Sequence, residues 1–160
     1  MIEFPKKILL ATDGGADSVH AAQVAVALVD KHGAELHVVH VGHVPQFGAG
    51  TRVEGGALPG EPPGYAEHQA KKLLEGQVEQ LRSIGGTVTE SHLRMGRPAV
   101  EVVALSVELE SDLLIVGSGG SRSLRRAFAA TTGRPPIGRV CEAIVHRAPC
   151  PVLLIRGELR

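Results

Sequence analysis

Short strand-like segments that alternate with helical patterns constrain the fold of this chain more than any other feature. Nearly continuous apolar runs occupy 7–12, 35–41, 113–116 and 151–155, and 87–94 alternates small or β-branched residues with polar ones. Between them, apolar residues recur three and four positions apart, as on one face of a helix. This order predicts an α/β fold, with a mostly parallel sheet, helices on both faces and right-handed crossovers.

Glycine, proline and small polar residues indicate where the helices begin and end. Four helices are expected: one capped by Asp17 or Ser18 and ended by Gly33, and others over about 65–84, 99–109 and 138–146. The connection 42–64 holds seven glycines and four prolines, which predicts a lid or a mobile loop. The length of 160 residues suits a single domain over 1–160.

Composition argues against several classes of function. Lys plus Arg equals Asp plus Glu at 17 each, and the chain has three Phe, one Tyr and no Trp, so neither a basic field nor stacking platforms favour nucleic acid. Cys141 and Cys150 lack metal-type spacing, and the N-terminus opens no long apolar segment. We therefore expect a cytoplasmic, reduced protein with no membrane span and no nucleic-acid partner.

In the segment 112–123, a short apolar run at 113–116 predicts a buried strand that is followed at once by glycines. Gly117, Gly119 and Gly120 leave main-chain N–H groups accessible, and arginines follow, a pattern that favours an anionic ligand. The alternative is that the glycines only allow the chain to reverse tightly after the strand, and that the arginines are ordinary solvated surface residues. The segment is not a P-loop, because no Gly-Lys-Ser/Thr follows, and Arg122 stands where the dinucleotide fingerprint requires glycine.

Three motifs together resemble the universal stress protein family along nearly the whole chain. They are the opening KILLATDG at 7–14, the turn GSGGS at 117–121 and the closing RAPCPVLLI at 147–155. The resemblance implies a single-domain, Rossmann-like sandwich with a five-stranded parallel sheet of order 3-2-1-4-5, usually dimeric. The ends of the first and fourth strands would then flank the switch point and bring Asp13 beside Gly117.

The family's ATP-binding pattern is only half present. It reads Gly, two residues, Gly, nine residues, Gly, then Ser or Thr; Gly117 and Gly120 match the first half, but Ala130 and Thr131 stand at the second. Aligned from the closing motif, the second half falls on Gly138 and Arg139, so 130–137 is expected to be an eight-residue insertion. Arg139 either binds a phosphate in place of the lost hydroxyl or fills the anion subsite and excludes nucleotide. A third alternative is that Thr131, Thr132 and Gly133 supply a substitute phosphate clamp from the inserted segment.

The resemblance implies ATP or AMP, with Mg²⁺, as the ligand. Asp13 and the backbone of Val41 would contact adenosine, although an Asp after a strand also commonly caps a turn. The complete set of expected binding residues is Ala11, Thr12, Asp13, Val41, Val116, Gly117, Gly120, Ser121, Gly138, Arg139 and Val140.

Other reactive side chains predict no further site. His37 and His40 lie three apart on a strand and therefore point to opposite faces, so no metal site is expected; His92 has no evident partner. Cys141 is expected to be an ordinary buried or helical cysteine. No catalytic residue is predicted, and any ATP hydrolysis should be slow.

Two functions follow from these observations. One is a homodimeric stress-response switch that binds an adenine nucleotide and pairs through the apolar strand 152–155. The other is a dimeric interaction module that binds no nucleotide, with its phosphate site altered by Arg139 and the insertion.

Overall fold

The computed structural model describes residues 4–43, 62–119 and 137–157. Most of the expected loop at 42–64, the residues Gly120 and Ser121, and all of the expected insertion at 130–137 except Ile137 lie outside these ranges.

Five parallel strands form one sheet, as the sequence predicts. They are β1 (Lys7–Ala11), β2 (Glu35–Gly42), β3 (Glu90–Met95), β4 (Leu113–Gly117) and β5 (Val152–Ile155). Their order is β3-β2-β1-β4-β5, which confirms the order implied by the resemblance. The chain winds in one direction from β1 to β3 and in the other from β4 to β5. The switch point therefore lies between β1 and β4.

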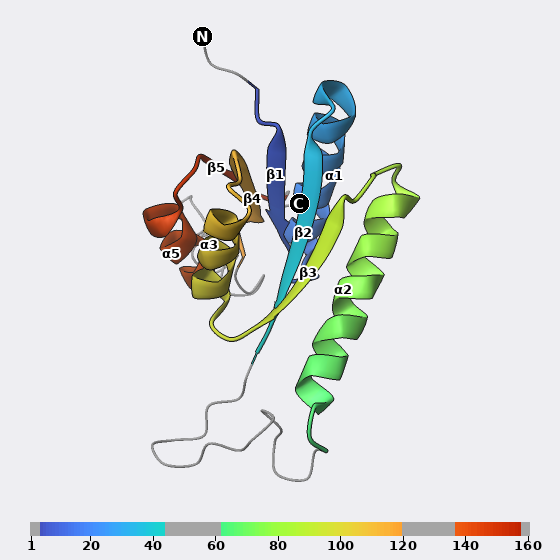
Figure 1. Cartoon of the computed structure of the whole chain (residues 1–160), viewed down its shortest axis with the longest axis vertical. Helices are drawn as coiled ribbons and strands as arrows, with labels where there is room; N and C mark the ends of the chain where they lie inside the picture. The colour runs from blue at the N-terminus through green and yellow to red at the C-terminus, as the bar shows by residue number, and fades with distance from the viewer. Residues whose placement is uncertain (1–3, 44–61, 120–136, 158–160) are drawn as a thin grey trace, which may run out of the picture.

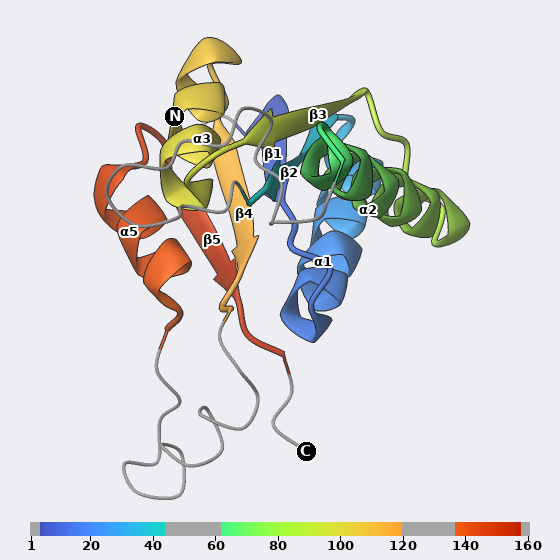
Figure 2. The same cartoon turned by 90° about the horizontal axis from the view of Figure 1, so that it is seen from below.

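Helices cover both faces of this sheet. They are α1 (Ala16–His32), α2 (Tyr65–Ser83), α3 (Pro98–Glu108) and α5 (Arg139–Arg147). Figures 1 and 2 show α1 and α2 on one side of the strands, and α3 and α5 on the other. Pro98 begins α3, and Gly33 ends α1 with a φ of 69°, a left-handed conformation that glycine adopts without strain.

Alternate residues of each strand feed two separate cores. Ile8, Leu10 and Leu36 are buried on the face that α1 and α2 cover. Leu9 and Val39 point the other way and pack with residues of α3 and α5. Burial on both faces explains why these strands read as nearly continuous apolar runs.

The structure differs from the sequence prediction at two element ends. Helix α1 begins at Ala16, and its N-cap is Gly15, which has no side chain to cap the helix. Asp17 and Ser18 lie inside the first turn, so the expectation that one of them caps this helix was wrong. Strand β3 begins at Glu90 rather than 87, because register with β2 begins at His37 and Glu90. Among the described residues, no helix combines the length and apolarity needed to cross a bilayer.

Candidate functional site

A cavity of about 350 Å³ lies where the carboxyl ends of the central strands meet the start of α5. Its apolar wall comes from β2, β4, α3 and α5, and its polar groups come mainly from the segment after β1 and the start of α5. The lining residues are Ala11, Thr12, Asp13, Ser18, Val39, Val41, Pro98, Val102, Val116, Gly117, Gly119, Gly138, Arg139, Val140, Cys141 and Ile144. A largely apolar cleft with a few polar groups is typical of small-molecule sites.

Asp13 lines the cavity and also organises the turn into α1. Its Oδ1 accepts hydrogen bonds from the N–H of Gly15, at 2.8 Å, and from the hydroxyl of Ser18. The Ser18 hydroxyl oxygen in turn accepts a bond from the N–H of Asp13 at 3.2 Å. Both bonds use Oδ1, which leaves Oδ2 without a hydrogen-bond donor among the described residues.

The end of β4 is tied to α1 and to the residues after β5 by a buried polar group. The Ser118 side chain is fully buried, and its hydroxyl donates to Oδ2 of Asp17. Oδ1 of Asp17 accepts the N–H of Gly157 at 3.1 Å. The carbonyl of Ile155 accepts the N–H of Ser118 at 2.7 Å. This network joins three separate parts of the chain beside Gly117 and Gly119, which line the cavity.

Gly117 is packed against the first turn of α1. A Cβ at this position would lie 2.9 Å from the carbonyl carbon of Asp17 and 3.0 Å from the nitrogen of Ser18. The sequence prediction attributed this glycine to ligand approach, but the structure shows that helix packing also requires it. Gly119 has a φ of 63°, so the chain turns toward α5 in a conformation that other residues rarely adopt.

The N-terminus of α5 opens onto the same cavity. Its N-cap is Gly138, which has no side chain to bond the first N–H groups of the helix. The N–H of Gly138 itself donates to the carbonyl of Ser118 at 2.9 Å. The first N–H groups of a helix lack intrahelical partners and carry the positive end of its dipole. Arg139, the first residue of α5, is exposed and lines the cavity, which adds a full positive charge there.

Cys141 faces the cavity with a buried, free thiol. Its Sγ donates to the carbonyl of Gly117 at 2.7 Å, and the residue is buried. Burial, aided by the negative charges of Asp13 and Asp17, raises the pKa of this thiol to about 11. The expectation of an ordinary buried cysteine is confirmed.

The cavity brings together every expected binding residue that the structure describes. These are Ala11, Thr12, Asp13, Val41, Val116, Gly117, Gly138, Arg139 and Val140; Gly120 and Ser121 lie outside the described residues. Their role in binding stays a prediction. The lining residues outside the expected set are Ser18, Val39, Pro98, Val102, Gly119, Cys141 and Ile144. Val39 had a usable signal, because it lies two residues before Val41 and so shares its face of β2.

The histidines of β2 point to opposite faces, as the sequence predicts. Nδ1 of His40 lies 2.9 Å from the carbonyl oxygen of Thr12. Nδ1 of His37 lies 3.1 Å from Nε2 of His92. The expectation that His92 has no partner was therefore wrong. Burial lowers the pKa of His92, against the opposing effect of Glu90.

Comparison with known proteins gives one family. The model of the universal stress protein family matches residues 5–156. A universal stress protein of Thermus aquaticus is 32% identical over 157 residues, covering 94% of this chain and 98% of that protein. One of Methanocaldococcus jannaschii is 28% identical over 152 residues, covering 94% of this chain and 82% of that protein.

Solved structures show the same fold at lower identity. UspA of Lactobacillus plantarum superposes with a TM-score of 0.70 at 20% identity, covering 98% of this chain and 100% of that one. A universal stress protein in complex with cAMP has a TM-score of 0.64 at 20% identity, covering 96% of this chain and 98% of that one. A universal stress protein of Archaeoglobus fulgidus in complex with dAMP has a TM-score of 0.61 at 22% identity, covering 97% of this chain and 99% of that one.

Proposed function

This chain belongs to the universal stress protein family, and we propose that it binds an adenine nucleotide as a stress-response switch. The observation that carries the proposal is the cavity at the switch point, where Asp13, the apolar end of β2 and the N-terminus of α5 line one space. Relatives of the same fold are complexed with cAMP and dAMP. An adenine ring suits the apolar wall, and a phosphate suits the helix N-terminus.

Each part of the nucleotide has a counterpart among the cavity residues. Val39, Val41 and Val116 offer apolar contact to a base, and Oδ2 of Asp13 is an acceptor for ribose hydroxyls. The N–H groups at the start of α5 and the guanidinium of Arg139 are donors for phosphate. Gly119 keeps the connecting backbone free of a side chain where it approaches Gly138.

Mg²⁺ would enter with the phosphates of ATP and needs few protein ligands. Asp13 is the only carboxylate among the described residues that line the cavity, and its Oδ1 already holds Gly15 and Ser18. We therefore expect any hydrolysis of ATP to be slow.

The two cysteines of the chain are free thiols, which supports a reducing, cytoplasmic compartment.

The test is a calorimetric titration of ligand-stripped protein with ATP and Mg²⁺, and then with AMP and adenosine. One site per chain with micromolar affinity for ATP or AMP is the expected result. No heat up to millimolar concentrations of all three ligands would overturn the proposal.

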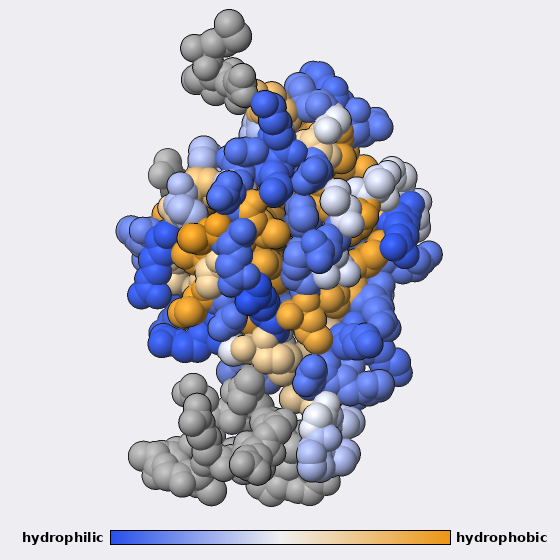
Figure 3. Space-filling view, in the orientation of Figure 1, coloured by the Kyte–Doolittle hydropathy of each residue, from blue (hydrophilic) through white to orange (hydrophobic). Residues whose placement is uncertain are grey.

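A second function is favoured by the position of Arg139. Its exposed side chain stands at the cavity beside the α5 N-terminus, where it can fill the anion subsite itself. The chain would then act as a dimeric interaction module without nucleotide. Val100 and Val107 of α3 and Val140 and Val145 of α5 are exposed, and Figure 3 shows apolar residues over these helices.

A further inference from the structure

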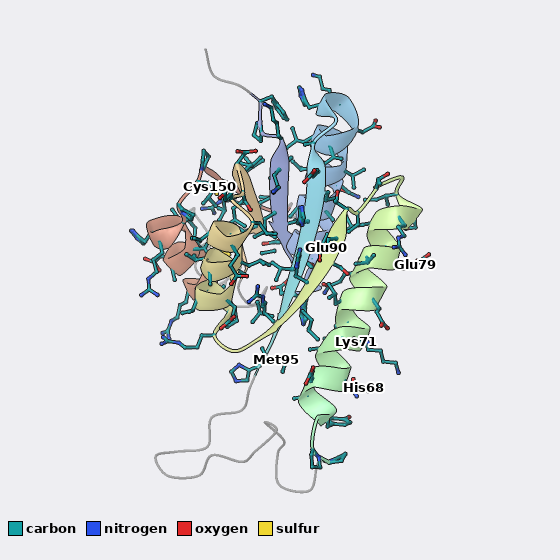
Figure 4. The ribbon with its side chains drawn as sticks, viewed as in Figure 1. His68, Lys71, Glu79, Glu90, Met95 and Cys150 are labelled. Atoms are coloured by element: carbon teal, nitrogen blue, oxygen red, sulfur yellow. The ribbon has the colours of Figure 1, made fainter. Side chains whose placement is uncertain are left out.

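Four side chains that the nucleotide proposal does not use gather at the β2–β3 edge of the sheet. Glu35 and His37 come from β2, and Glu90 and His92 come from β3. The register pairs His37 with Glu90 and Val39 with His92. Paired residues of parallel strands share a face, so all four side chains lie on the side of α3 and α5. Figure 4 labels Glu90 where β3 runs beside β2.

Three of these residues place one metal-ligating atom each around a common centre. Nδ1 of His37 lies 3.1 Å from Nε2 of His92. Oε2 of Glu90 lies 3.8 Å from the His92 nitrogen and 4.0 Å from the His37 nitrogen. A circle through atoms at these separations has a radius of about 2.1 Å, and zinc bonds to nitrogen and oxygen are about 2.0–2.2 Å long. One point is therefore at bonding distance from all three atoms.

The polarity of the cluster also suits a cation. The side chains of His37 and His92 are 7% and 13% exposed, whereas that of Glu90 is 62% exposed, so an ion reaches the buried nitrogens past the carboxylate. Of the positive charges on this face, Arg94 pairs with Glu108 of α3. Lys7, which is in register with Glu35, donates from its Nζ to the carbonyl of Leu109. The arrangement combines two imidazoles with one carboxylate, a ligand set common to zinc sites.

Glu35 lies next to Nε2 of His37, the ring nitrogen that faces away from the common centre. Nε2 of His37 is buried, has no hydrogen-bond partner among the described residues, and lies 3.5 Å from Oε2 of Glu35. Metal binding at Nδ1 would hold the proton on Nε2 and direct that N–H toward the Glu35 carboxylate. Metal-bound histidines are commonly oriented by a carboxylate in this way.

We propose that His37, Glu90 and His92 form a zinc site, with Glu35 as a positioning residue and a fourth coordination position open to water. The ion would join β2 to the edge strand β3. None of these four residues is among the described residues that line the cavity at the switch point. Zinc binding and nucleotide binding are therefore separate properties, and either can fail without the other.

The experiment uses the untagged full chain, stripped with EDTA and titrated with Zn²⁺ against a chromophoric chelator. One equivalent per chain is expected. Glu90→Gln and His92→Gln should each weaken binding by at least about 100-fold, since each removes a direct ligand, and Glu35→Gln by about 10–100-fold. His43→Gln is the matched control, because His43 is exposed beyond the end of β2 and is not part of the cluster.

Two further readouts distinguish zinc bound by this cluster from zinc bound by a cysteine. Zinc should raise the unfolding temperature of the wild type but not of His92→Gln. The Co²⁺-loaded protein should lack a thiolate charge-transfer band, and Cys150→Ser should bind Zn²⁺ normally. Binding of less than one equivalent, or unchanged affinity in both Glu90→Gln and His92→Gln, would overturn the proposal, provided that circular dichroism shows both variants folded.

Discussion

Asp13 performs a structural task at the same position where it meets the cavity. Its Oδ1 holds the N–H of Gly15 and the hydroxyl of Ser18, and so fixes the turn that leads into α1. Asparagine can preserve these two bonds through its side-chain oxygen but removes the negative charge from the cavity. The structural role of Asp13 and its proposed contact with nucleotide can thus be separated by substitution.

We expect Asp13→Asn to lower nucleotide affinity about tenfold, because a hydrogen bond to a charged acceptor is worth about 1.5–3 kcal/mol. Its unfolding free energy should stay close to that of the wild type. Asp13→Ala should also lose about 1 kcal/mol of stability, as when a helix cap is removed. Calorimetry and urea unfolding measure the two effects. Asp30→Asn, an exposed acid at the far end of α1, is the control; equal affinity of Asp13→Asn and wild type would contradict the prediction.

Arg139 decides between the two functions that the cavity allows. If its guanidinium binds phosphate, Arg139→Ser should weaken ATP by about tenfold or more and leave adenosine nearly unchanged. If the side chain excludes nucleotide, the same variant should bind ATP more tightly than the wild type. Titration of the variant with both ligands measures this difference. Arg147→Ser, at the other end of α5, serves as the matched control.

Cys141 should react slowly with alkylating reagents because the thiolate is the nucleophile. Burial holds the pKa of this thiol at about 11, above its ordinary value of 9.0, so little thiolate is present at neutral pH. The rate of iodoacetamide labelling should therefore rise steadily with pH up to about that value. Mass spectrometry of the labelled peptide measures the rate, and urea-unfolded protein supplies the fast reference. A native rate equal to the unfolded one at pH 7.5 would refute this expectation.

At the scale of elements, the contact between β4 and α1 depends on polar atoms rather than on apolar packing alone. Ser118 donates from the end of β4 to Asp17 in the first turn of α1. The same carboxylate accepts the N–H of Gly157 after β5. A helix and the ends of two strands are therefore held in one arrangement by a single aspartate.

Ser118→Ala should cost about 1–3 kcal/mol of unfolding free energy, because it removes a buried donor from a charged acceptor. Urea unfolding measures the loss. Ser83→Ala is the control: the hydroxyl of Ser83 donates to the carbonyl of Gln80 on the exposed side of α2. A cost for Ser118→Ala no larger than that of the control would show that the tie contributes little to stability.

At the scale of the whole molecule, β5 is the strand through which we propose that two copies pair. It ends the sheet beyond β4. The carbonyls of Pro151 and Ile155 face β4, accepting from the N–H groups of Leu114 and Ser118. In a parallel strand the intervening positions point the other way, so Val152 directs its N–H to the open edge.

Val152→Pro removes this outward N–H and should weaken dimerisation at least tenfold without breaking the pairing with β4. Sedimentation of the wild type and the variant over a range of concentrations measures the change. Circular dichroism checks that the variant remains folded. A wild type that is monomeric at all concentrations, or a dimer unaffected by the substitution, would rule out this edge as the interface.

Local sequence patterns predicted the elements of this fold well. Apolar runs marked the strands, because burial on both faces leaves little place for polar residues. Gly33 and Pro98 marked the ends of helices through their backbone conformations. The sheet order and the candidate cavity required the family resemblance, since periodicity gives the faces of a strand but not its neighbours. With that order known, Asp13 and Gly138 could be placed at one site.

The sequence by itself therefore determined the type and succession of elements, which depend on the periodicity and backbone preferences of nearby residues. Only the tertiary structure decided which distant side chains meet. The register of β2 against β3 joins His37 to Glu90 and His92, and the packing of α1 on β4 joins Asp17 to Ser118. These contacts depend on how elements pack across the whole chain. A shift of one residue in strand register would move the side chains of that strand to the opposite face of the sheet and break the contacts.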